Sequence, residues 1–438
     1  MMLEARKQTE KLLEWIRKSP AAFHAAQTMG SILEENGFER LEEADHWRLR
    51  AGGKYFVTRN LSSLIAFCVP KQSASQILIA AGHTDSPMFK LKNNYESVAF
   101  DRYLKLDTEV YGGTILSSWL DRPLSVSGRL IVRQGDVFSA KLVRVDRDLL
   151  LIPNVAIHMN RDANNGYAFN PATDLVPLFG GENAKGRLKK ILADEAGCNP
   201  EEIVGHDLFV YNRMPGSVWG ADDEFFSSPR IDNLMCAFGT LSGFCAATPR
   251  EDSLNICFNA DNEETGSETK QGAGSSFLRD VIDRVCEAIG ADSRRLLASG
   301  FMVSADNGHA RHPNRPELCD PLNAPHLNQG VVIKSNAAQH YATDGLSAAI
   351  FTEICTRAGV PVQQFANRSD IRGGSTLGSI SNTKVPLRTV DIGMAQLAMH
   401  SAYETAGTAD FAYLTNAMRL FYSVGFQSAT DRDVRLIF

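Results

Sequence analysis

The sequence predicts an α/β fold in which a mixed, mostly parallel sheet is flanked by helices and interrupted by a β-rich insertion. Short apolar runs alternate with segments of helical periodicity near both ends of the chain. That alternation stops between about residues 88 and 226, where β-type segments follow one another. A chain of 438 residues has room for two or three domains. We therefore expect one domain built from residues 1–87 and 227–438, and an inserted domain at 88–226.

The first 87 residues are predicted to form a helix followed by strands. Leu12, Leu13 and Ile16 recur at helical spacing and give the opening segment one apolar face. Apolar and β-branched runs predict strands at 55–57, 63–69 and 76–81. The last of these strands ends abruptly at Gly82 and His83.

The insertion at 88–226 is predicted to be mostly β-structure. Alternating segments at 125–132 and 137–145 flank a glycine-containing turn, which is the pattern of a hairpin. One short charged helix is expected near 184–196. Two glycine pairs punctuate the region, Gly112-Gly113 and Gly180-Gly181.

After residue 227 the chain returns to alternating helices and strands, as in an α/β layer. Leu234, Phe238, Leu241 and Cys245 follow Asp232 at helical spacing, which predicts a helix that begins near that aspartate. Strands are expected at 254–260, 301–305 and 385–392. Helices are expected at 277–289, 345–357 and 410–426.

Composition excludes several classes of protein. The chain is 44% hydrophobic and 22% charged, with a net charge of −6 and no basic run, so nucleic-acid binding is disfavoured. No stretch approaches the roughly 20 apolar residues of a membrane span, and the N-terminus lacks the apolar core of a signal peptide. The eight cysteines show no C-x-x-C spacing and suit a reducing compartment. We expect a cytoplasmic protein without membrane or nucleic-acid partners.

Four predicted strand ends carry charged or imidazole side chains. The segments are His83-Thr-Asp85 after 76–81, Asp261-Asn-Glu263-Glu264 after 254–260, Asp306 after 301–305, and Asp391 with His400 shortly beyond. In open α/β sheets, ligands bind beyond the carboxyl ends of the strands. These clusters can therefore meet at one site although hundreds of residues separate them.

Each of these residues also has an ordinary structural explanation. Asp232 precedes a helix and could cap it, because aspartate commonly accepts the first amide protons. His83 could be a hydrogen-bonded histidine at a strand end, and the Glu263-Glu264 pair could be solvated loop charge. Asp306 could cap a turn, and His400 could lie on a half-buried helix face.

As a set, the residues favour a metal centre. Two histidines and several carboxylates match the ligand types that suit Zn²⁺ and related ions. Two ions about 3.5–4 Å apart need a bridging ligand, and a carboxylate can bridge because it has two oxygens. Two histidines and three carboxylates, one of them bridging, would give each ion three protein ligands.

Five strings occur in one order along the chain, and they are Ala-Gly-His83-Thr-Asp85-Ser-Pro87, Arg230-Ile-Asp232-Asn-Leu234, Asp261-Asn-Glu263-Glu264-Thr-Gly266-Ser, Ser304-Ala-Asp306 and Ala398-Met-His400-Ser401. Together they resemble the M18 family of dinuclear metallo-aminopeptidases, the aspartyl aminopeptidases. The resemblance covers essentially the whole chain, including the β-rich insertion. It is the combination that is specific to this family, since no single string would be.

The resemblance implies a role for each matching position. His83 and Asp306 would hold one ion, Glu264 and His400 the other, and Asp232 would bridge them. Glu263 would be the general base that deprotonates the attacking water, and Asp85 would orient the His83 imidazole. The two divalent ions would most simply be Zn²⁺, with Mn²⁺ or Co²⁺ as alternatives, because the same ligands accept all three.

The resemblance also implies an assembly and a substrate class. Members of the family assemble through the inserted domain into a hollow tetrahedral dodecamer, in which a histidine of the insertion reaches a neighbouring active site. His158 is the matching position here. Lys334 would recognise the acidic N-terminal residue of the substrate peptide, and Tyr341 would line the pocket. Two nearby positions differ from the family pattern, with Asn154 in place of histidine and His340 in place of arginine.

Three functional hypotheses follow from the sequence. The first is an aminopeptidase that removes N-terminal Asp or Glu through a water activated by Glu263. The second keeps the metal site but changes the substrate, as in an aminopeptidase of broader or neutral specificity, a carboxypeptidase or a deacylase. The third is an assembly protein with a degenerate site, which the retention of all the matching ligand and base positions disfavours.

Overall fold

The computed structural model describes residues 2–371, 373–428 and 432–438. Its centre is a nine-stranded sheet in the order β1-β2-β3-β13-β4-β14-β18-β16-β17. The strands are β1 (Glu39–Leu41), β2 (Lys54–Arg59), β3 (Ser63–Cys68), β4 (Gln76–His83), β13 (Ser253–Ala260), β14 (Phe301–Ala305), β16 (Val331–Lys334), β17 (Val362–Phe365) and β18 (Arg388–Gly393). The pairs β1–β2, β13–β4, β14–β4, β14–β18 and β16–β17 are parallel, whereas β2–β3, β13–β3 and β16–β18 are antiparallel. The predicted mixed, mostly parallel sheet is confirmed.

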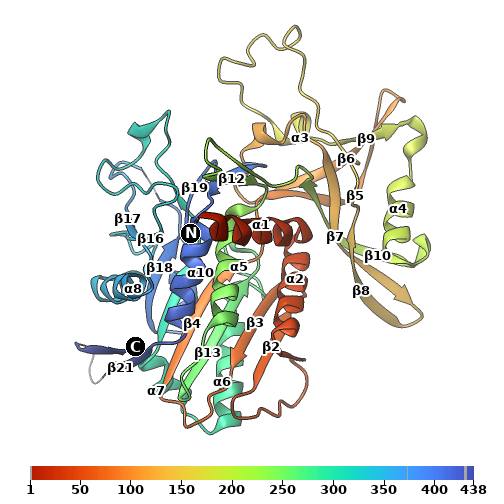
Figure 1. Ribbon diagram of the computed structural model, residues 1–438. Helices are drawn as coiled ribbons and strands as arrows, with labels where there is room; N and C mark the ends of the chain where they lie inside the picture. Colours follow the sequence, from red (N-terminus) through yellow and green to blue (C-terminus); the bar gives the residue numbers. More distant parts are fainter. Residues whose placement is uncertain (1, 372, 429–431) are drawn as a thin grey trace.

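Helices cover both faces of this sheet (Figure 1). One face carries α1 (Met2–Lys18), α2 (Ala22–Glu35), α5 (Ile231–Ala246), α8 (Gly345–Arg357) and α10 (Asp410–Phe421), and the other carries α6 (Phe277–Ile289) and α7 (Ser293–Ala298). The central strand β4 is buried throughout, with Leu78 and Ala80 packed in one helical layer and Ile77 and Ile79 in the other. A strand covered on both faces reads as a continuous apolar run, which is why 76–81 was identifiable from sequence.

A second, six-stranded antiparallel sheet has the order β8-β7-β10-β5-β6-β9. Its strands are β5 (Met88–Ala99), β6 (Tyr103–Tyr111), β7 (Leu124–Gln134), β8 (Val137–Arg144), β9 (Leu178–Gly181) and β10 (Ile203–Asn212). Together with α3 (Pro171–Asp174) and α4 (Arg187–Ala196), these strands lie to one side of the nine-stranded sheet (Figure 1). They have a hydrophobic cluster of their own, built on residues such as Leu130 and Leu208. We call residues 88–226 the insert.

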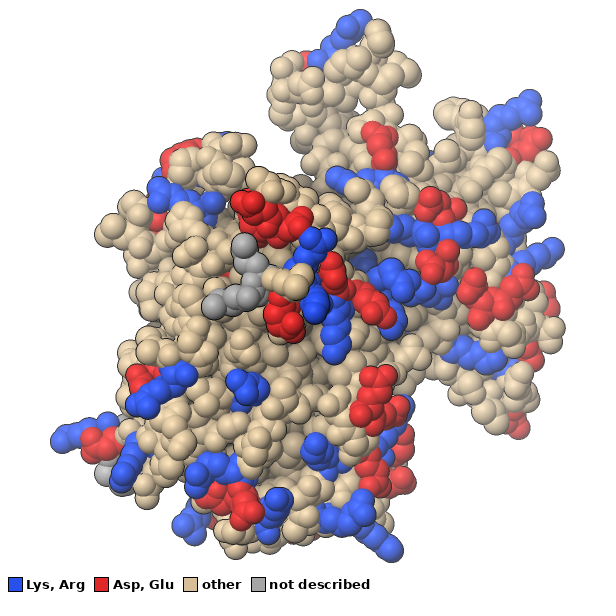
Figure 2. Space-filling view, in the orientation of Figure 1, with Lys and Arg blue, Asp and Glu red and all other residues tan. Residues whose placement is uncertain are grey.

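A third sheet joins the end of the insert to the rest of the chain. Its order is β11-β12-β20-β19-β15, where β11 is Ser217–Trp219, β12 is Phe225–Ser228, β15 is Gly308–His309, β19 is Ala395–Leu397 and β20 is Glu404–Gly407. Strand β12 spans residue 226 and pairs with β11 on one side and β20 on the other, so one sheet crosses the predicted domain limit. The limit at residue 226 stays a prediction. Figure 2 shows basic and acidic side chains interspersed on the visible face of the described residues, over both parts of the molecule. No helix of the described residues has the length and apolar character required to cross a bilayer.

Three predicted boundaries were wrong. The closing helix ends at Phe421 rather than 426, because Gly425–Ser428 forms strand β21 and pairs with β22 (Val434–Ile437). Val424, just before this strand, and Phe426, within it, are apolar and buried. Their positions also fit a helical pattern, so the sequence predicted that the helix would continue through them. The strand predicted from 385 begins at Arg388, since the proline at 386 has no N–H to donate. The helix expected from 184 begins at Arg187 after a short 3-10 turn.

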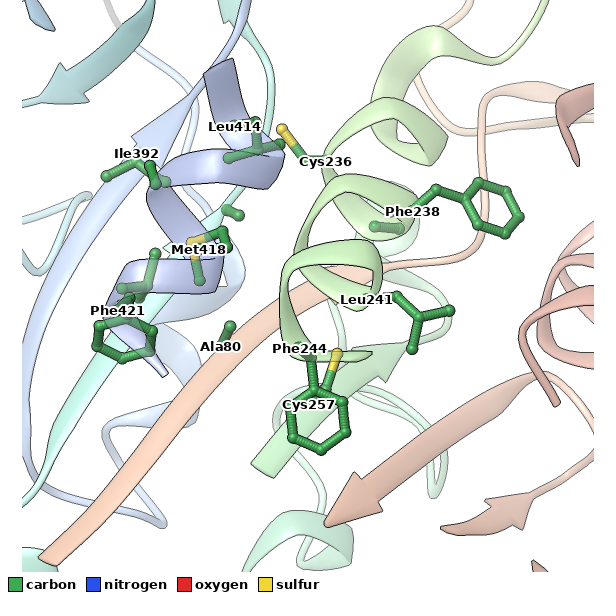
Figure 3. Close-up of a cluster of buried hydrophobic side chains, with 14 of the residues drawn as sticks. Ala80, Cys236, Phe238, Leu241, Phe244, Cys257, Ile392, Leu414, Met418 and Phe421 are labelled. Atoms are coloured by element: carbon green, nitrogen blue, oxygen red, sulfur yellow. The ribbon is translucent and has the colours of Figure 1, made fainter. Parts of the chain in front are cut away.

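Helices α5 and α10 cross at two glycines. A Cβ atom on Gly239 would lie 2.5 Å from Leu414 Cδ2, and one on Gly243 would overlap Met418 and lie 2.9 Å from the Arg419 backbone nitrogen. Figure 3 shows Leu414 and Met418 of α10 facing α5, in the same cluster as Cys236 and Leu241. Helices α5 and α10 therefore pack with their backbones close together along the middle of α5.

We predict that Gly243→Ala destabilises the fold by about 2 kcal/mol, because over-packing a buried contact outweighs the gain in helix propensity. Gly345, at the start of α8, is the matched control, since a Cβ there meets no described atom within 4 Å. Gly345→Ala should be neutral or stabilising by up to about 1 kcal/mol. Urea unfolding measures the free energy of unfolding, which should fall for Gly243→Ala and stay equal or rise for Gly345→Ala. Equal changes in the two variants would contradict the close contact.

Acid should destabilise the protein through His24. Burial on α2, together with Arg144 and Arg230, lowers the pKa of His24 to about 4. The unfolded chain takes up this proton below a pKa of about 6.5 and the folded chain does not, so stability falls as pH decreases from about 6.5 to 4. Between pH 7.5 and 5.0, the wild type should lose about 2 kcal/mol more than His24→Leu in urea unfolding. Parallel pH curves for the two proteins would contradict this.

Candidate metal centre

Three neighbouring parallel strands deliver side chains to one edge of the large sheet. His83 ends β4, Asp306 follows β14, and Glu263 and Glu264 follow β13 in a 3-10 turn (Glu263–Thr265). Strand β4 lies between the other two and is parallel to both. Their carboxyl ends therefore meet at the same edge, which is where ligands bind in α/β sheets.

Asp232 lies between two histidines. Its Oδ1 is 3.7 Å from His83 Nε2, and its Oδ2 is 3.5 Å from His400 Nε2. The residue lies in the first turn of α5 with non-helical backbone angles, and the helix has no side-chain cap. The capping explanation is therefore not what the structure shows, because both carboxylate oxygens face imidazoles.

Each histidine has a further carboxylate of its own. His83 Nε2 is 3.4 Å from Asp306 Oδ1, and His400 Nε2 is 3.4 Å from Glu264 Oε2. The arrangement thus has two halves, each with one imidazole and one carboxylate, and Asp232 is common to both. His83, Asp232 and Glu264 also offer ligand atoms that all lie within 4.8 Å of one another.

Asp85 organises the side of the site near His83. Its Oδ1 is 3.3 Å from His83 Nδ1, which leaves Nε2 of that ring facing Asp232 and Asp306. The same carboxylate accepts the backbone N–H groups of Glu263 and Glu264, each at 3.2 Å. It also accepts the hydroxyl of Tyr111 at 2.8 Å, a residue that no sequence pattern marked.

The site gathers several carboxylates where little water reaches them. Asp232 Oδ1 and Glu264 Oε1 are buried and have no hydrogen-bond partner among the described residues. Burial, followed by the charges of Asp306 and Asp85, raises the pKa of Glu263 to about 8. Burial and the charge of Asp232 likewise raise the pKa of Glu264 well above its ordinary value. Divalent cations would satisfy these oxygens, so the residues present fit a metal centre.

Glu404 is a buried carboxylate that the sequence analysis missed. Its Oε2 accepts the backbone N–H of Asp232 at 3.0 Å, and its Oε1 accepts that of His400 at 2.7 Å. Only 1% of the residue is exposed. One side chain thus ties together the backbones of two candidate ligands. A carboxylate that binds backbone amides leaves no spacing signal, so the sequence could not have indicated it.

The predicted substrate residues fall in different places. Lys334 is 2% exposed, and its Nζ donates to Asp306 Oδ2 at 3.2 Å and to the Asn307 carbonyl at 2.7 Å. Tyr341 lies beside it, with the ring centroid 5.5 Å from Nζ. His158 is exposed in the 153–170 loop, which projects from the insert, away from the large sheet (Figure 1). The structure therefore brings Lys334 and Tyr341 to the site but not the His158 of the same chain.

Buried histidines and carboxylates at the strand ends of a mixed α/β sheet are typical of metallohydrolases. Comparison with known proteins is more specific. The family model described as aminopeptidase I zinc metalloprotease (M18) matches residues 15–422. A probable M18 family aminopeptidase 2 of Clostridium acetobutylicum is 45% identical over 426 residues, which cover 95% of this chain and 98% of that protein.

Solved structures agree over nearly the whole chain. A chain in the cryo-EM structure of the Ape4 and Nbr1 complex has a TM-score of 0.93 at 35% identity, covering 96% of this chain and 86% of that one. The S. cerevisiae mApe1 dodecamer has a TM-score of 0.85 at 25% identity, covering 95% of this chain and 96% of that one. The chain therefore belongs to the M18 family of zinc aminopeptidases, which are hydrolases of peptide bonds.

We predict that Glu404→Gln weakens zinc binding by about 10- to 100-fold, because groups that orient metal ligands typically contribute that much. The amide would place an N–H₂ group against one of two backbone N–H donors. Asp410→Asn is the matched control, since its buried carboxylate also accepts two backbone N–H groups, those of Asn328 and Gly330. Chelator competition should show a loss only in Glu404→Gln. Equal zinc affinity in the two variants would remove Glu404 from this role.

Proposed function

We propose that this chain is a two-metal aminopeptidase that removes N-terminal aspartate and glutamate from peptides. The observation that carries the proposal is the position of Asp232, whose two oxygens face two different histidines. A single ion would need only one such pair. A carboxylate shared between two sets of ligands is what a pair of ions requires.

The chain's own residues would hold the ions in two groups. His83 and Asp306 would bind one, Glu264 and His400 the other, and Asp232 both. Zinc is the ion named for the family, and Mn²⁺ or Co²⁺ would suit the same ligands. When bound, such ions polarise a water molecule and the substrate carbonyl, which supplies the Lewis acidity of the reaction.

Glu263 would move the proton. Its side chain lies among His83, Asp306 and Asp85, whose charges affect its pKa, and its backbone N–H is held by Asp85. A carboxylate there takes a proton from the attacking water as the water adds to the peptide carbonyl. It then gives that proton to the departing amine nitrogen as the C–N bond breaks. Asp85 positions both this residue and His83.

Lys334 would supply the preference for acidic residues. An ammonium group has three donors, and described residues take up two of those of Lys334, namely Asp306 and the Asn307 carbonyl. The third donor would bind a substrate carboxylate. Because the group is buried, water would screen the attraction between the two opposite charges only weakly. Tyr341 would close one side of this pocket, and His158 would enter from a neighbouring subunit.

The insert would form the contacts between subunits. Large apolar side chains are exposed along it, including Val98, Phe100, Val137, Phe138, Met159 and Val204. Such surface favours burial against another chain. With a dodecamer among the similar structures, we propose a tetrahedral dodecamer built from dimers. The free cysteines, such as the buried Cys68 and Cys257, are consistent with a reducing cytoplasm.

The test is hydrolysis of Asp-, Glu- and Leu-anilides by the purified protein, with and without a chelator. Cleavage that prefers Asp or Glu, and that the chelator abolishes, is the expected result. Preference for Leu would overturn the acidic specificity but keep the metal centre. Zinc analysis should give two ions per chain, and one ion would contradict the bridging role of Asp232.

We predict that Glu263→Gln lowers kcat by about 10²–10⁴-fold or more while zinc content stays unchanged, because the amide cannot accept the proton. Glu268→Gln is the matched control, since Glu268 is an exposed glutamate of the same loop. Its kcat should equal that of the wild type. A wild-type kcat for Glu263→Gln would exclude Glu263 as the base.

A further inference from the structure

Residues 111–115 of the insert, which we call the strap, lie against the candidate metal centre. The strap leaves β6 at Tyr111 and contains the Gly112-Gly113 pair. It contacts three residues of the site, which are Asp85, Glu264 and His400. The proposed function uses the insert for assembly and for the His158 that would enter a neighbouring subunit's site, and it leaves these contacts within one chain without a role.

The first contact sets the orientation of His400. Its Nδ1 lies 3.0 Å from the Gly113 carbonyl oxygen, which can only accept a hydrogen bond. The proton of a neutral imidazole is therefore on Nδ1, and Nε2 carries the lone pair. That nitrogen is the one that faces Asp232 and Glu264. The strap thus selects the tautomer that can bind a metal ion.

The second contact holds the backbone of His400. This residue has φ +67°, a left-handed conformation that a non-glycine residue adopts only when its surroundings enforce it. The His400 carbonyl accepts the Ile115 N–H at 2.9 Å and the Thr114 hydroxyl at 3.2 Å. Both donors belong to the strap, so the insert maintains the conformation that aims the ring.

The third contact explains the glycine pair. Gly112 has φ +73°, and a Cβ there would lie 3.0 Å from Glu264 Cβ. A Cβ on Gly113 would lie 3.4 Å from His400 Nδ1. The backbone of the strap therefore packs directly on two candidate ligands. Next to the pair, the Tyr111 hydroxyl donates to Asp85, which extends the same support to the half of the site around His83.

We infer that the strap is a positioning element of the metal centre, through which the insert of each chain completes the site of that same chain. The inference rests on the proposed function for the identity of the ligands. It makes Gly112 and Thr114 positioning residues for the ion held by His400 and Glu264. Loss of their contacts should weaken the binding of that ion in particular, because its ligands would lose their orientation while the rest of the fold stays intact.

The experiment measures zinc stoichiometry and affinity by competition with a chromophoric chelator, using the full chain. Gly112→Ala and Thr114→Val should bind one zinc ion about 10- to 100-fold more weakly than the wild type. Gly135→Ala is the matched control, since Gly135 has φ +62° in the same insert but no described atom within 4 Å of an added Cβ. Thr114→Ser keeps the hydroxyl and should restore the affinity. Sedimentation and thermal unfolding of the zinc-free proteins should match the Gly135→Ala control.

Wild-type affinity for both ions in Gly112→Ala and Thr114→Val would overturn the role of the strap. An equal loss in Gly135→Ala would do the same, because backbone strain alone would then explain the effect. Should Gly112→Ala fail to fold, Thr114→Val against Thr114→Ser decides the matter. One zinc ion in the wild type would instead contradict the two-ion proposal, and the affinity of that ion would still test the strap.

Discussion

The structure depends on one buried carboxylate, that of Asp232, which is shared between His83 and His400. Around it lie Glu264, Asp306 and Glu263, so negative charge accumulates where water is scarce. Buried charge is costly unless it is paired or binds a cation. The surroundings offset part of the cost, because Lys334 pairs with Asp306 and backbone amides bind Asp85. Two divalent ions would balance the remainder.

Holding these groups together requires parts of the chain that are far apart in sequence. Helices α5 and α10, which are far apart in sequence, pack closely at Gly239 and Gly243. Glu404 then binds the backbone of Asp232 and of His400 at once. These two candidate ligands are thus positioned by the scaffold as well as by their neighbours. Preorganisation of this kind is what a metal site needs to hold its ions in one geometry.

The insert has two faces with different chemistry. Its surface exposes apolar side chains such as Phe100, in the turn between β5 and β6, and Phe138, on the edge strand β8, as a surface that meets another chain would. Its inner end, the strap, contacts His400 and Asp85 of the same chain. Both parts belong to one six-stranded sheet, because the strap continues from β6 and Phe138 lies on β8.

Residue type and local pattern were enough to predict the mixed sheet and the strand that ends at His83, because buried strands are apolar runs. They also brought the candidate ligands together as one set, whereas the role of each candidate came from the resemblance to a family. The same patterns misplaced the end of α10, since an apolar residue such as Phe426 suits a helix and a strand equally. Only the tertiary structure shows Glu404 and the strap, which act through backbone amides and carbonyls that every residue carries. It also pairs Lys334 with Asp306. Such contacts depend on how distant segments pack, and no local sequence signal records that.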